Sequence, residues 1–475
     1  MTTVALGLDL ATAAARLLAV TDEGAVVAER TAALAPVESP AAGHREQRPV
    51  YPEVARRLLA AVVADLGPLA ARVRALATSG TSGTVVPADA AGAPIGSAVL
   101  YSDQRAGAEA AALRSAGRPS TSTSPLARIG WLHRHRPAAR YEFTPDTVTA
   151  DLLGRPAPTD TSHALKAGID PTGATWDPDA LAAVGVDPAT LPDLVHPGTV
   201  LGEVAPAVAR AVGLPAGVAV VAGMTDGCTA QIAAGAVVPG DTVGVLGTTL
   251  VWKGVSDVPV TGFDGALYSH LAPDGRWWPG GASNVGAGPV RDEFGGADPG
   301  RLAELEALAA AHGPAEAVRY PLRGTGERFP FATPAARGFL LGEVPDESGA
   351  YRALLEGVAY VERLGLEALA DHGVPVRRHH LAGGASRNTL WNRIRATVLD
   401  VPVVRPRRSG SAYGAAVLAL AAVTGCGLGE ALARTGAGDD PVEPLPGERE
   451  RLMDGYARLR AELARRGYLG VAAPT

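Results

Sequence analysis

The chain contains very few lysines and cysteines. Lys166 and Lys253 are the only lysines among 475 residues, so nearly all of the positive charge is carried by arginine. Neither lysine follows a glycine, which excludes the Gly-Lys-Ser/Thr phosphate loop of Walker-type nucleotide-binding proteins. Cys228 and Cys426 stand alone, without a Cys-x-x-Cys pair, and this spacing argues against a disulfide framework and against a zinc site.

Several catalytic signatures are also missing. The sequence has no His-Arg-Asp or Asp-Phe-Gly motif, no Gly-x-Ser-x-Gly turn and no His-Glu-x-x-His motif. Lysine and arginine total 43 against 49 acidic residues, a net charge of −6, which argues against nucleic acid and anionic membranes as partners. The first nine residues lack a basic segment, and no uninterrupted apolar run has membrane-spanning length. We therefore expect no signal peptide, no membrane anchor and a cytoplasmic location.

The sequence does contain enough apolar residues for two large domains. Hydrophobic residues make up 47% and charged residues 19% of the chain, a balance typical of folded proteins. Short apolar runs alternate with helical patterns, and several runs end in glycine-rich turns, which predicts an α/β fold. A strand hairpin with a small turn opens each half, at residues 4–27 and 241–252. This similarity suggests an internal duplication with a boundary near residues 235–242.

Apolar periodicity predicts the position of individual elements. The predicted helices cover residues 51–65, 300–312, 348–372, 411–424 and an amphipathic C-terminal segment from residue 448. The predicted strands outside the two hairpins include residues 75–78, 85–86, 98–101, 218–222, 379–382 and 401–404. Residues 115–125 and 436–447 are rich in turn-forming residues and are expected to be loops.

The tight turn Gly247-Thr-Thr249 joins two predicted strands. Consecutive backbone N–H groups in such a turn can form a nest that binds phosphate oxygens without a lysine, and glycine lets the anion approach closely. An ordinary hairpin turn is the simpler alternative.

Asp9 is ambiguous in a similar way. An Asp at the end of a strand beside a small turn can hold a hydrated Mg²⁺, or it can form an Asx-turn.

Asp226 follows Gly223-Met-Thr225 at a predicted strand–helix junction. Its carboxylate can act as a general base or can simply cap the helix. Cys228, two residues later, fits a core position better than a nucleophile. The segment Gly383-Gly-Ala385, with Asn388 on the following helix, suggests a shelf for a flat ring or a ribose.

Taken together, these segments occur in the order seen in one protein family. From about residue 4 to residue 425 the chain resembles the FGGY carbohydrate kinases. The segments that carry the resemblance are Asp9…Thr12, Tyr101-Ser-Asp-Gln-Arg105, Gly223…Asp226, Gly247-Thr-Thr249, Gly326-Glu-Arg328, Ala336-Arg-Gly338, Leu355-Glu-Gly-Val-Ala359 and Gly383-Gly-Ala385…Asn388…Trp391.

The resemblance implies two actin-like α/β domains of the ribonuclease H type with a cleft between them. Residues 1–238 would form the N-terminal sugar-binding domain, and residues 239–430 the C-terminal ATP-binding domain. Residues 431–475 would add a loop and an amphipathic helix that docks on the domains. The resemblance also implies ATP and Mg²⁺ as cofactors, with a small-molecule sugar as substrate. No nucleic-acid or membrane partner is expected, and a homodimer is left open.

The resemblance also assigns roles to individual residues. Asp226 would be the catalytic base that accepts the proton of the sugar hydroxyl, and Asp9 and Asp226 would hold Mg²⁺. The implied sugar site consists of Asp9, Ala13, Ser82, Asp103, Arg105 and Asp226. The implied nucleotide site consists of Thr12, Gly247, Thr248, Thr249, Gly286, Gly383, Gly384, Ala385 and Asn388.

Several stretches look closest to the branch of the family described as D-ribulose kinases. They include Ser79-Gly-Thr-Ser-Gly-Thr-Val85, Ser122-Thr-Ser-Pro-Leu-Ala-Arg128, His163-Ala-Leu-Lys-Ala-Gly168 and Tyr268-Ser-His270. Xylulokinases proper resemble Ser-Gly-Gln-Met-His-Gly at the first of these stretches, and this chain lacks that histidine. The resemblance therefore implies phosphorylation of a ketopentose at its terminal hydroxyl, with D-ribulose converted to D-ribulose 5-phosphate.

The first loop departs from the family pattern Asp-x-Gly-Thr. Ala11 replaces the glycine, and Ala13-Ala14 stands where the closest branch has Ser-Gly. A serine at this position could contact a sugar hydroxyl, which Ala13 cannot. Several alternatives therefore stay open: a kinase for D-xylulose, another ketose or a polyol, a degenerate kinase that serves as a nucleotide-gated sugar sensor, and an actin- or chaperone-like ATPase.

Overall fold

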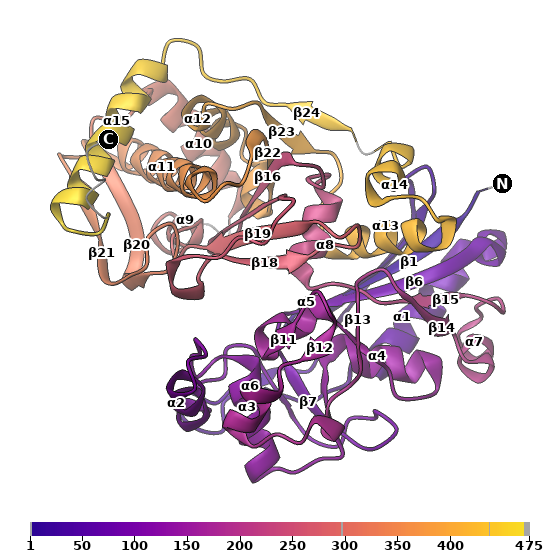
Figure 1. Cartoon of the computed structure of the whole chain (residues 1–475). Helices are drawn as coiled ribbons and strands as arrows, with labels where there is room; N and C mark the ends of the chain where they lie inside the picture. Colours follow the sequence, from indigo (N-terminus) through magenta and orange to yellow (C-terminus); the bar gives the residue numbers. More distant parts are fainter. Residues whose placement is uncertain (1, 296–297, 437, 470–475) are drawn as a thin grey trace. The chain divides into compact units, whose positions relative to one another are not determined.

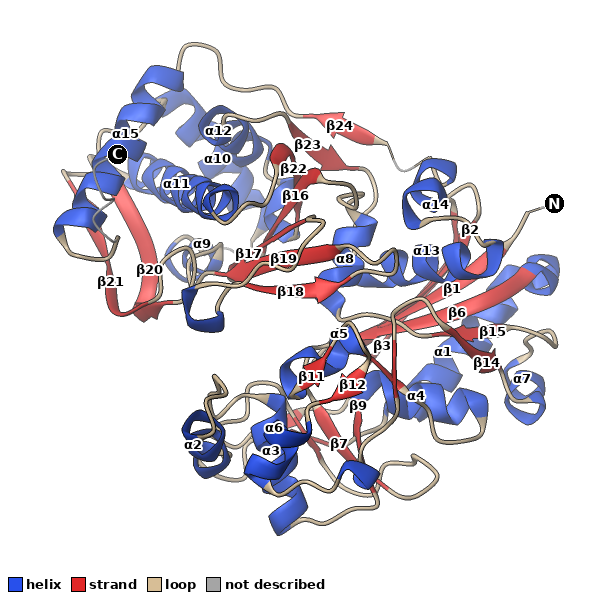
Figure 2. Ribbon diagram, viewed as in Figure 1, coloured by secondary structure: helices blue, strands red, loops and turns tan. Residues whose placement is uncertain are grey.

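The computed structural model describes residues 2–295, 298–436 and 438–469. Helices and strands alternate along the chain (Figure 1, Figure 2), which confirms the predicted α/β class. The chain forms two compact units. Unit 1 comprises Met1–Gly235, His270–Gly275 and Arg408–Ala437, and unit 2 comprises Ala236–Ser269, Arg276–Arg407 and Gly438–Thr475.

The central sheet of unit 1 combines an antiparallel meander with parallel strands. The first three strands pair antiparallel, as the apolar runs at the start of the chain predict, and β1 pairs parallel with β6, which pairs parallel with β15. In spatial order the strands are β14 (Val200–Glu203), β15 (Ala219–Val221), β6 (Val73–Gly80), β1 (Val4–Leu10), β2 (Ala14–Thr21) and β3 (Val26–Ala33). The helices that share its apolar core are α1 (Tyr51–Leu66), α4 (Thr144–Leu153) and α7 (Pro206–Val212).

A smaller sheet and several helices complete unit 1. Val85 pairs with Val99, and both residues lie in strands that the sequence predicts. The strands of this sheet are β4 (Val37–Glu38), β5 (Glu46–Gln47), β8 (Ala98–Val99), β7 (Val85–Ala88) and β9 (Arg140–Phe143). Two short strand pairs join β10 (Thr159–Asp160) with β13 (Leu194–Val195) and β11 (Ile169–Asp170) with β12 (Thr175–Trp176). The remaining α-helices are α2 (Gly107–Ser115), α3 (Pro125–His135), α5 (Thr161–Ala164), α6 (Pro178–Val184), α8 (Asp226–Ala233), α13 (Ser411–Thr424) and α14 (Leu428–Arg434).

The sheet of unit 2 repeats the strand order of unit 1. An antiparallel meander of β16, β17 and β19 is followed by parallel pairing of β16 with β22 and of β22 with β23. At the parallel end of each sheet one more strand pairs antiparallel, β14 with β15 in unit 1 and β24 with β23 in unit 2. The shared connections support the predicted internal duplication. In spatial order the strands are β18 (Tyr268–Leu271, of which His270 and Leu271 are counted with unit 1), β19 (Trp277–Ala282), β17 (Leu250–Gly254), β16 (Gly240–Leu246), β22 (Val376–Ala382), β23 (Val403–Pro406) and β24 (Asp439–Pro441).

The helices of unit 2 largely follow the sequence pattern, with one difference in a predicted loop. The elements around the sheet are α9 (Gly288–Glu293), α10 (Pro299–His312), β20 (Val318–Glu327), β21 (Thr333–Leu341), α11 (Glu347–Asp371), α12 (Thr389–Leu399) and α15 (Arg449–Arg465). The predicted loop at 436–447 contains the short strand β24. Its Asp440 pairs in register with Arg405, and Asp440 Oδ1 lies 2.8 Å from Arg407 Nε. Backbone pairing with β23 holds this strand, which has no apolar pattern of its own, and the exposed charge pairs add little.

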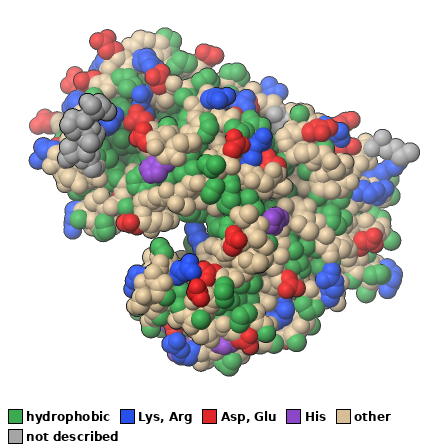
Figure 3. All heavy atoms as spheres, in the orientation of Figure 1, with side chains coloured by type: hydrophobic (Ala, Val, Ile, Leu, Met, Phe, Trp, Pro, Cys, Tyr) green, Lys and Arg blue, Asp and Glu red, His purple; other side chains and the backbone are tan. Residues whose placement is uncertain are grey.

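Charged side chains of both signs are spread over the surface. On the face shown in Figure 3, acidic and basic side chains alternate in small groups, in keeping with a net charge of −6. Within the described residues, no single helix is long and apolar enough to cross a membrane. The helices α13 and α14 together pass that test by length and composition, but they meet at an angle of 109°.

Helix α13 belongs to unit 1, although it follows most of unit 2 in the sequence. It lies beside β1 and α8 (Figure 1). The approach is so close that a Cβ added to Gly7 of β1 would lie 1.9 Å from the carbonyl oxygen of Ala412. A Cβ added to Gly414 of α13 would lie 1.8 Å from the carbonyl oxygen of Thr229 in α8. The small residues of this helix are therefore required by backbone-to-backbone packing.

We predict that Gly7→Ala destabilises the protein by about 1–3 kcal/mol, because the new methyl group would push the backbone of α13 away from β1. Thermal or urea unfolding of the full chain measures this change. Gly96→Ala is the matched control, since a Cβ at Gly96 would meet nothing within 4 Å. Equal stability of the Gly7→Ala variant and the control would contradict this packing.

Candidate active site

Two carboxylates lie at the same edge of the central sheet in unit 1. Asp9 is near the carboxyl end of β1, where it is in register with Ser79 of the parallel strand β6. Asp226 begins α8, directly after Thr225, which forms a parallel bridge with Gly80 at the end of β6. Since the carboxyl ends of parallel strands meet at one edge of a sheet, the fold brings these two predicted residues together.

The environment of Asp9 disfavours its charged form. Burial and, second, the negative charge of Asp226 raise the pKa of Asp9 to about 7, against the opposing effect of the Arg16 guanidinium. Its Oδ1 atom is buried and accepts no hydrogen bond from any described residue. An unsatisfied carboxylate oxygen beside a second carboxylate suits a hydrated Mg²⁺, which commonly binds one or two carboxylates and keeps several waters. The residues present therefore fit the predicted magnesium site.

The backbone around Asp226 is held from several sides. Thr225 occupies the N-cap position, and Asp226 is the first residue of the helix, with Oδ1 accepting a hydrogen bond of 2.7 Å from the Gly227 N–H. The Ser411 hydroxyl of α13 donates to the Asp226 carbonyl oxygen at 3.0 Å. Asp226 is therefore not the N-cap residue. Its position in the first turn favours a negative charge through the helix dipole.

A buried polar cluster beside this turn was not among the predicted site residues. The Ser162 hydroxyl accepts a hydrogen bond of 3.2 Å from the Thr225 N–H and lies 3.1 Å from His270 Nδ1. His163 Nδ1 lies 2.6 Å from Asp160 Oδ2. Burial lowers the pKa of His163, but nearby carboxylates, Asp160 first, outweigh this effect and raise it overall. Both histidines lie in stretches that carry the family resemblance, and this was the only sequence signal that pointed to them.

The other predicted sugar-site residues fall into two groups. Ser82 is half-buried in the loop after β6, which is tied to the end of β1 by the Thr81 N–H to Leu10 carbonyl bond of 3.3 Å. The Ser82 hydroxyl makes no hydrogen bond within the described part of the chain and is therefore available to a ligand. Ala13 is exposed in the turn between β1 and β2, and Thr12 is half-buried there.

Asp103 and Arg105 are engaged with each other. The Asp103 carboxylate accepts hydrogen bonds from the Arg105 side chain at 2.7 and 2.8 Å, and Arg105 Nη1 lies 2.7 Å from Glu46 Oε1. Both side chains are almost fully buried. The buried ion pair joins these side chains within the loop, and their contact with a sugar stays a prediction.

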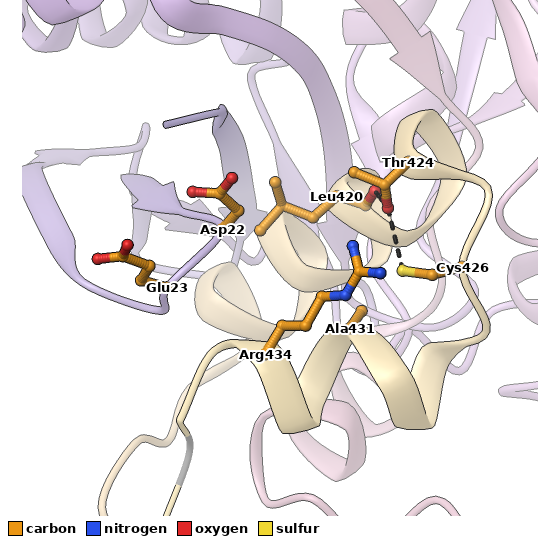
Figure 4. Close-up of a pocket in the computed structure, with 7 residues that line it drawn as sticks. All are labelled: Asp22, Glu23, Leu420, Thr424, Cys426, Ala431 and Arg434. Carbon is orange, nitrogen blue, oxygen red and sulfur yellow. Dashed lines mark hydrogen bonds between the residues drawn. The ribbon is translucent and has the colours of Figure 1, made fainter. Parts of the chain in front are cut away.

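The two cysteines are free thiols, and one of them lines a separate pocket in unit 1. Figure 4 shows this pocket of about 290 Å³. Cys426 Sγ lies 3.0 Å from the Thr424 hydroxyl oxygen. Asp22, another lining residue, follows the end of β2 that pairs with Val4, so it lies at the sheet edge opposite Asp9. Among the described residues, no group of three or more His, Cys, Asp or Glu side chains could hold a metal ion.

Unit 2 contains a pocket of about 540 Å³ that gathers many of the predicted nucleotide-binding residues. Gly247, Thr248, Gly384, Ala385 and Asn388 line it. Its walls also include residues that no local motif had indicated, namely Val290, Arg291, Leu302, Ala303, Glu306 and Tyr351. These come from α9, α10 and α11, three helices that are far from the glycine-rich turns in the sequence.

The predicted glycines differ in what surrounds them. A Cβ added at Gly247 would meet only the Thr249 carbonyl oxygen at 3.8 Å, and one at Gly384 would meet nothing within 4 Å. A Cβ at Gly286 would lie 2.5 Å from the Thr248 carbonyl oxygen, and one at Gly383 2.4 Å from that of Leu246. Gly286 and Gly383 are therefore needed to pack the turns, whereas the open space at Gly247 and Gly384 is free for a ligand.

The wall opposite the turn is fixed by side-chain hydrogen bonds. Asn388 caps α12 by accepting a bond of 2.7 Å from the Trp391 N–H, and its amide donates to the Tyr351 hydroxyl at 3.2 Å. The Trp391 indole N–H donates to the Leu355 carbonyl oxygen at 2.9 Å. Asn388 is therefore a structural cap as well as a pocket residue. The arrangement offers a partly aromatic slot beside the turn. The Gly247 N–H of this turn donates to the Thr249 carbonyl oxygen at 3.0 Å, so a phosphate would meet the N–H groups of Thr248 and Thr249.

Comparison with known proteins identifies two matching family models. Residues 4–233 match the N-terminal domain of the FGGY family of carbohydrate kinases, and residues 242–423 match the C-terminal domain of the same family. The matched segments together span most of both units.

Individual relatives differ in their substrates. The gluconokinase of Bacillus subtilis (strain 168) is 24% identical over 458 residues, covering 88% of each chain. The glycerol kinase of Bordetella parapertussis is 30% identical over 412 residues, covering 78% of each chain. The solved structure of a xylulose kinase from Rhodospirillum rubrum is 28% identical, with a TM-score of 0.84 over 98% of this chain and 99% of that chain. These relatives share the fold but are named for different acceptors.

We predict that Gly247→Val weakens ATP binding while leaving the stability of the free protein unchanged. The branched side chain fits the open space of the unliganded turn but would occupy the position of a phosphate group. Calorimetric titration with ATP, beside a thermal unfolding curve, measures both quantities. Wild-type affinity for ATP in this variant would exclude the turn as the phosphate site.

We also predict that Asp9→Asn stabilises the free protein at alkaline pH and not at acidic pH. The pKa of Asp9 is raised from 3.8 to about 7, so the folded state resists ionisation. The wild-type protein therefore loses stability as the pH rises from about 4 to above 7, and the asparagine variant does not share this loss. The difference in unfolding temperature between the two proteins should grow from pH 5 to pH 8. A difference that is constant with pH would contradict the burial of this charge.

Proposed function

Since the chain belongs to the FGGY family of carbohydrate kinases, an ATP-dependent sugar kinase, we propose that it phosphorylates the terminal hydroxyl of a ketopentose. The acceptor we propose is D-ribulose, with D-ribulose 5-phosphate as product. The observation that carries this function is the meeting of Asp9 and Asp226 at one sheet edge, with a buried, unsatisfied oxygen on Asp9. Such a pair suits the binding of a polar substrate beside a cation.

In this proposal unit 1 binds the sugar and unit 2 binds ATP. Phosphoryl transfer depends mainly on positioning and on charge stabilisation. Asp226 accepts the proton of the attacking hydroxyl, a role that a carboxylate held in position beside the substrate can fill. The N–H groups of the Gly247-Thr-Thr249 turn bind the terminal phosphate. Asp9, with Asp226, would hold Mg²⁺, which when bound supplies positive charge against the phosphate oxygens.

The choice of sugar rests on the loop after β6. In this loop the Thr81 and Thr84 hydroxyl oxygens lie 3.0 Å apart and bond to each other, which leaves Ser82 as the side chain with a free hydroxyl. A hydroxyl at this position can recognise a sugar hydroxyl without the histidine expected in xylulokinases. D-Xylulose is the second candidate acceptor, because the solved xylulose kinase is among the similar structures.

A sugar screen with the purified full chain tests the proposal. We predict that ATP consumption with D-ribulose gives the highest kcat/KM among D-ribulose, D-xylulose, gluconate and glycerol. Asp226→Asn should lower kcat by about 10²–10⁴-fold, the usual contribution of a general base. Asp22→Asn is the matched control at the opposite sheet edge and should leave kcat unchanged.

Two outcomes would count against the proposal. More than a third of wild-type turnover in the Asp226→Asn variant would show that Asp226 is not the base. Turnover with gluconate or glycerol but with neither ketopentose would exclude the proposed substrate class while leaving the kinase activity in place.

A further inference from the structure

We propose that Glu306 recognises the exocyclic amino group of adenine and so makes this enzyme selective for adenine nucleotides. This inference deepens the proposed function and rests on the assignment of the unit 2 pocket to ATP. It concerns the only acidic side chain among the residues that line that pocket in the described part of the chain.

The position of Glu306 is fixed by contacts on one side only. Its Oε1 atom accepts a hydrogen bond of 2.8 Å from the Leu390 N–H at the start of α12. The side chain is half-buried in the pocket wall. Glu306 also lies close enough to Tyr351 to affect its ionisation. Burial, and second the negative charge of Glu306, raise the pKa of Tyr351 to about 12. One carboxylate oxygen is thus held by the protein, and the other is the acceptor available to a ligand.

Electrostatics decides which part of a nucleotide can lie beside this carboxylate. A triphosphate and a carboxylate repel each other, so in this proposal the phosphates bind at the Gly247-Thr-Thr249 turn and not beside Glu306. Tyr351, whose pKa Glu306 raises, and Leu302, one helical turn before Glu306 on α10, add apolar surface to the pocket wall beside this carboxylate. Such a surface suits the faces of a purine ring, which leaves the carboxylate to meet a donor on the edge of that ring.

The available acceptor suits adenine and opposes hypoxanthine. Adenine carries an amino group at C6, a donor for the carboxylate oxygen, whereas hypoxanthine carries a carbonyl oxygen there, which the carboxylate repels. A glutamine at position 306 can still accept from the Leu390 N–H with its carbonyl oxygen, and it then presents an amide N–H₂ to the base. Glu306→Gln should therefore favour the 6-oxo purine.

Calorimetric titration of the full chain without sugar provides the first test. The wild-type protein should bind ADP about tenfold more tightly than purine riboside diphosphate, which lacks only the amino group, since one hydrogen bond to a charged group is lost. Equal affinities for these two nucleotides would overturn the proposal without any variant. Absence of ADP binding would instead contradict the proposed function itself.

The Glu306→Gln variant provides the second test. Its preference for ADP over IDP should fall at least tenfold relative to the wild-type protein, with IDP binding improved. Glu304→Gln is the matched control, because Glu304 lies on the same helix and pairs with Arg301 at 2.6 Å, outside the pocket. An unchanged ratio in Glu306→Gln would overturn the proposal. The proposal would also be overturned if Glu306→Gln changed the ratio of the affinities for ADP and 2′-deoxy-ADP but not the ratio for ADP and IDP. That result would place the carboxylate at the ribose.

Discussion

The close contact of α13 with β1 and α8 is the constraint on which the candidate sugar site depends. Glycines at Gly7 and Gly414 allow backbone atoms to approach where any side chain would collide. The same helix supplies the Ser411 hydroxyl that holds the carbonyl of Asp226. One helix therefore fixes the strand that carries Asp9 and the helix that carries Asp226. A segment distant in sequence thus sets the spacing of the two carboxylates.

This arrangement buries the carboxylate of Asp9 beside that of Asp226, which is electrostatically unfavourable. Asp9 is held in a place that raises its pKa, so the free protein is less stable at neutral pH than it would be with a neutral side chain. Residues that lower the stability of the folded protein in this way are typical of functional sites. The pocket of unit 2 is lined differently, by the residues of two glycine-rich turns, by apolar side chains and by the charged Arg291, Glu306 and Arg387. The same strand order thus supports two different kinds of site.

The sequence alone predicted much of the local structure. The hairpins at each half, the helices at 51–65 and 411–424 and the glycine-rich strand ends all follow from short-range patterns, and the structure confirms them. The grouping of α13 with unit 1 could not be predicted, because it depends on contacts between residues about 400 positions apart, such as Gly7 and Ala412. The strand β24 was missed because it has no apolar alternation and forms through backbone pairing with β23, a segment more than 30 residues earlier.

The candidate sites show the same limit. Asp9, Asp226 and the Gly247 turn carry local signals, whereas Glu306 and Tyr351 lie on helices whose sequence looks like any amphipathic surface. Their role becomes visible only when the fold places them around one pocket. For Asp103 and Arg105 a motif suggested ligand contacts, and the structure shows a buried ion pair between them. A motif indicates that residues matter but does not distinguish binding from support.

Phosphorus NMR of the reaction mixture tests the central claim most directly. The account predicts that ATP and D-ribulose, with Mg²⁺ and the full chain, give ADP and one phosphomonoester in equal amounts, with the phosphorus coupled to the two protons on C5 of the sugar. Release of inorganic phosphate without a sugar phosphate would contradict the account, because it would show an ATPase and not a kinase.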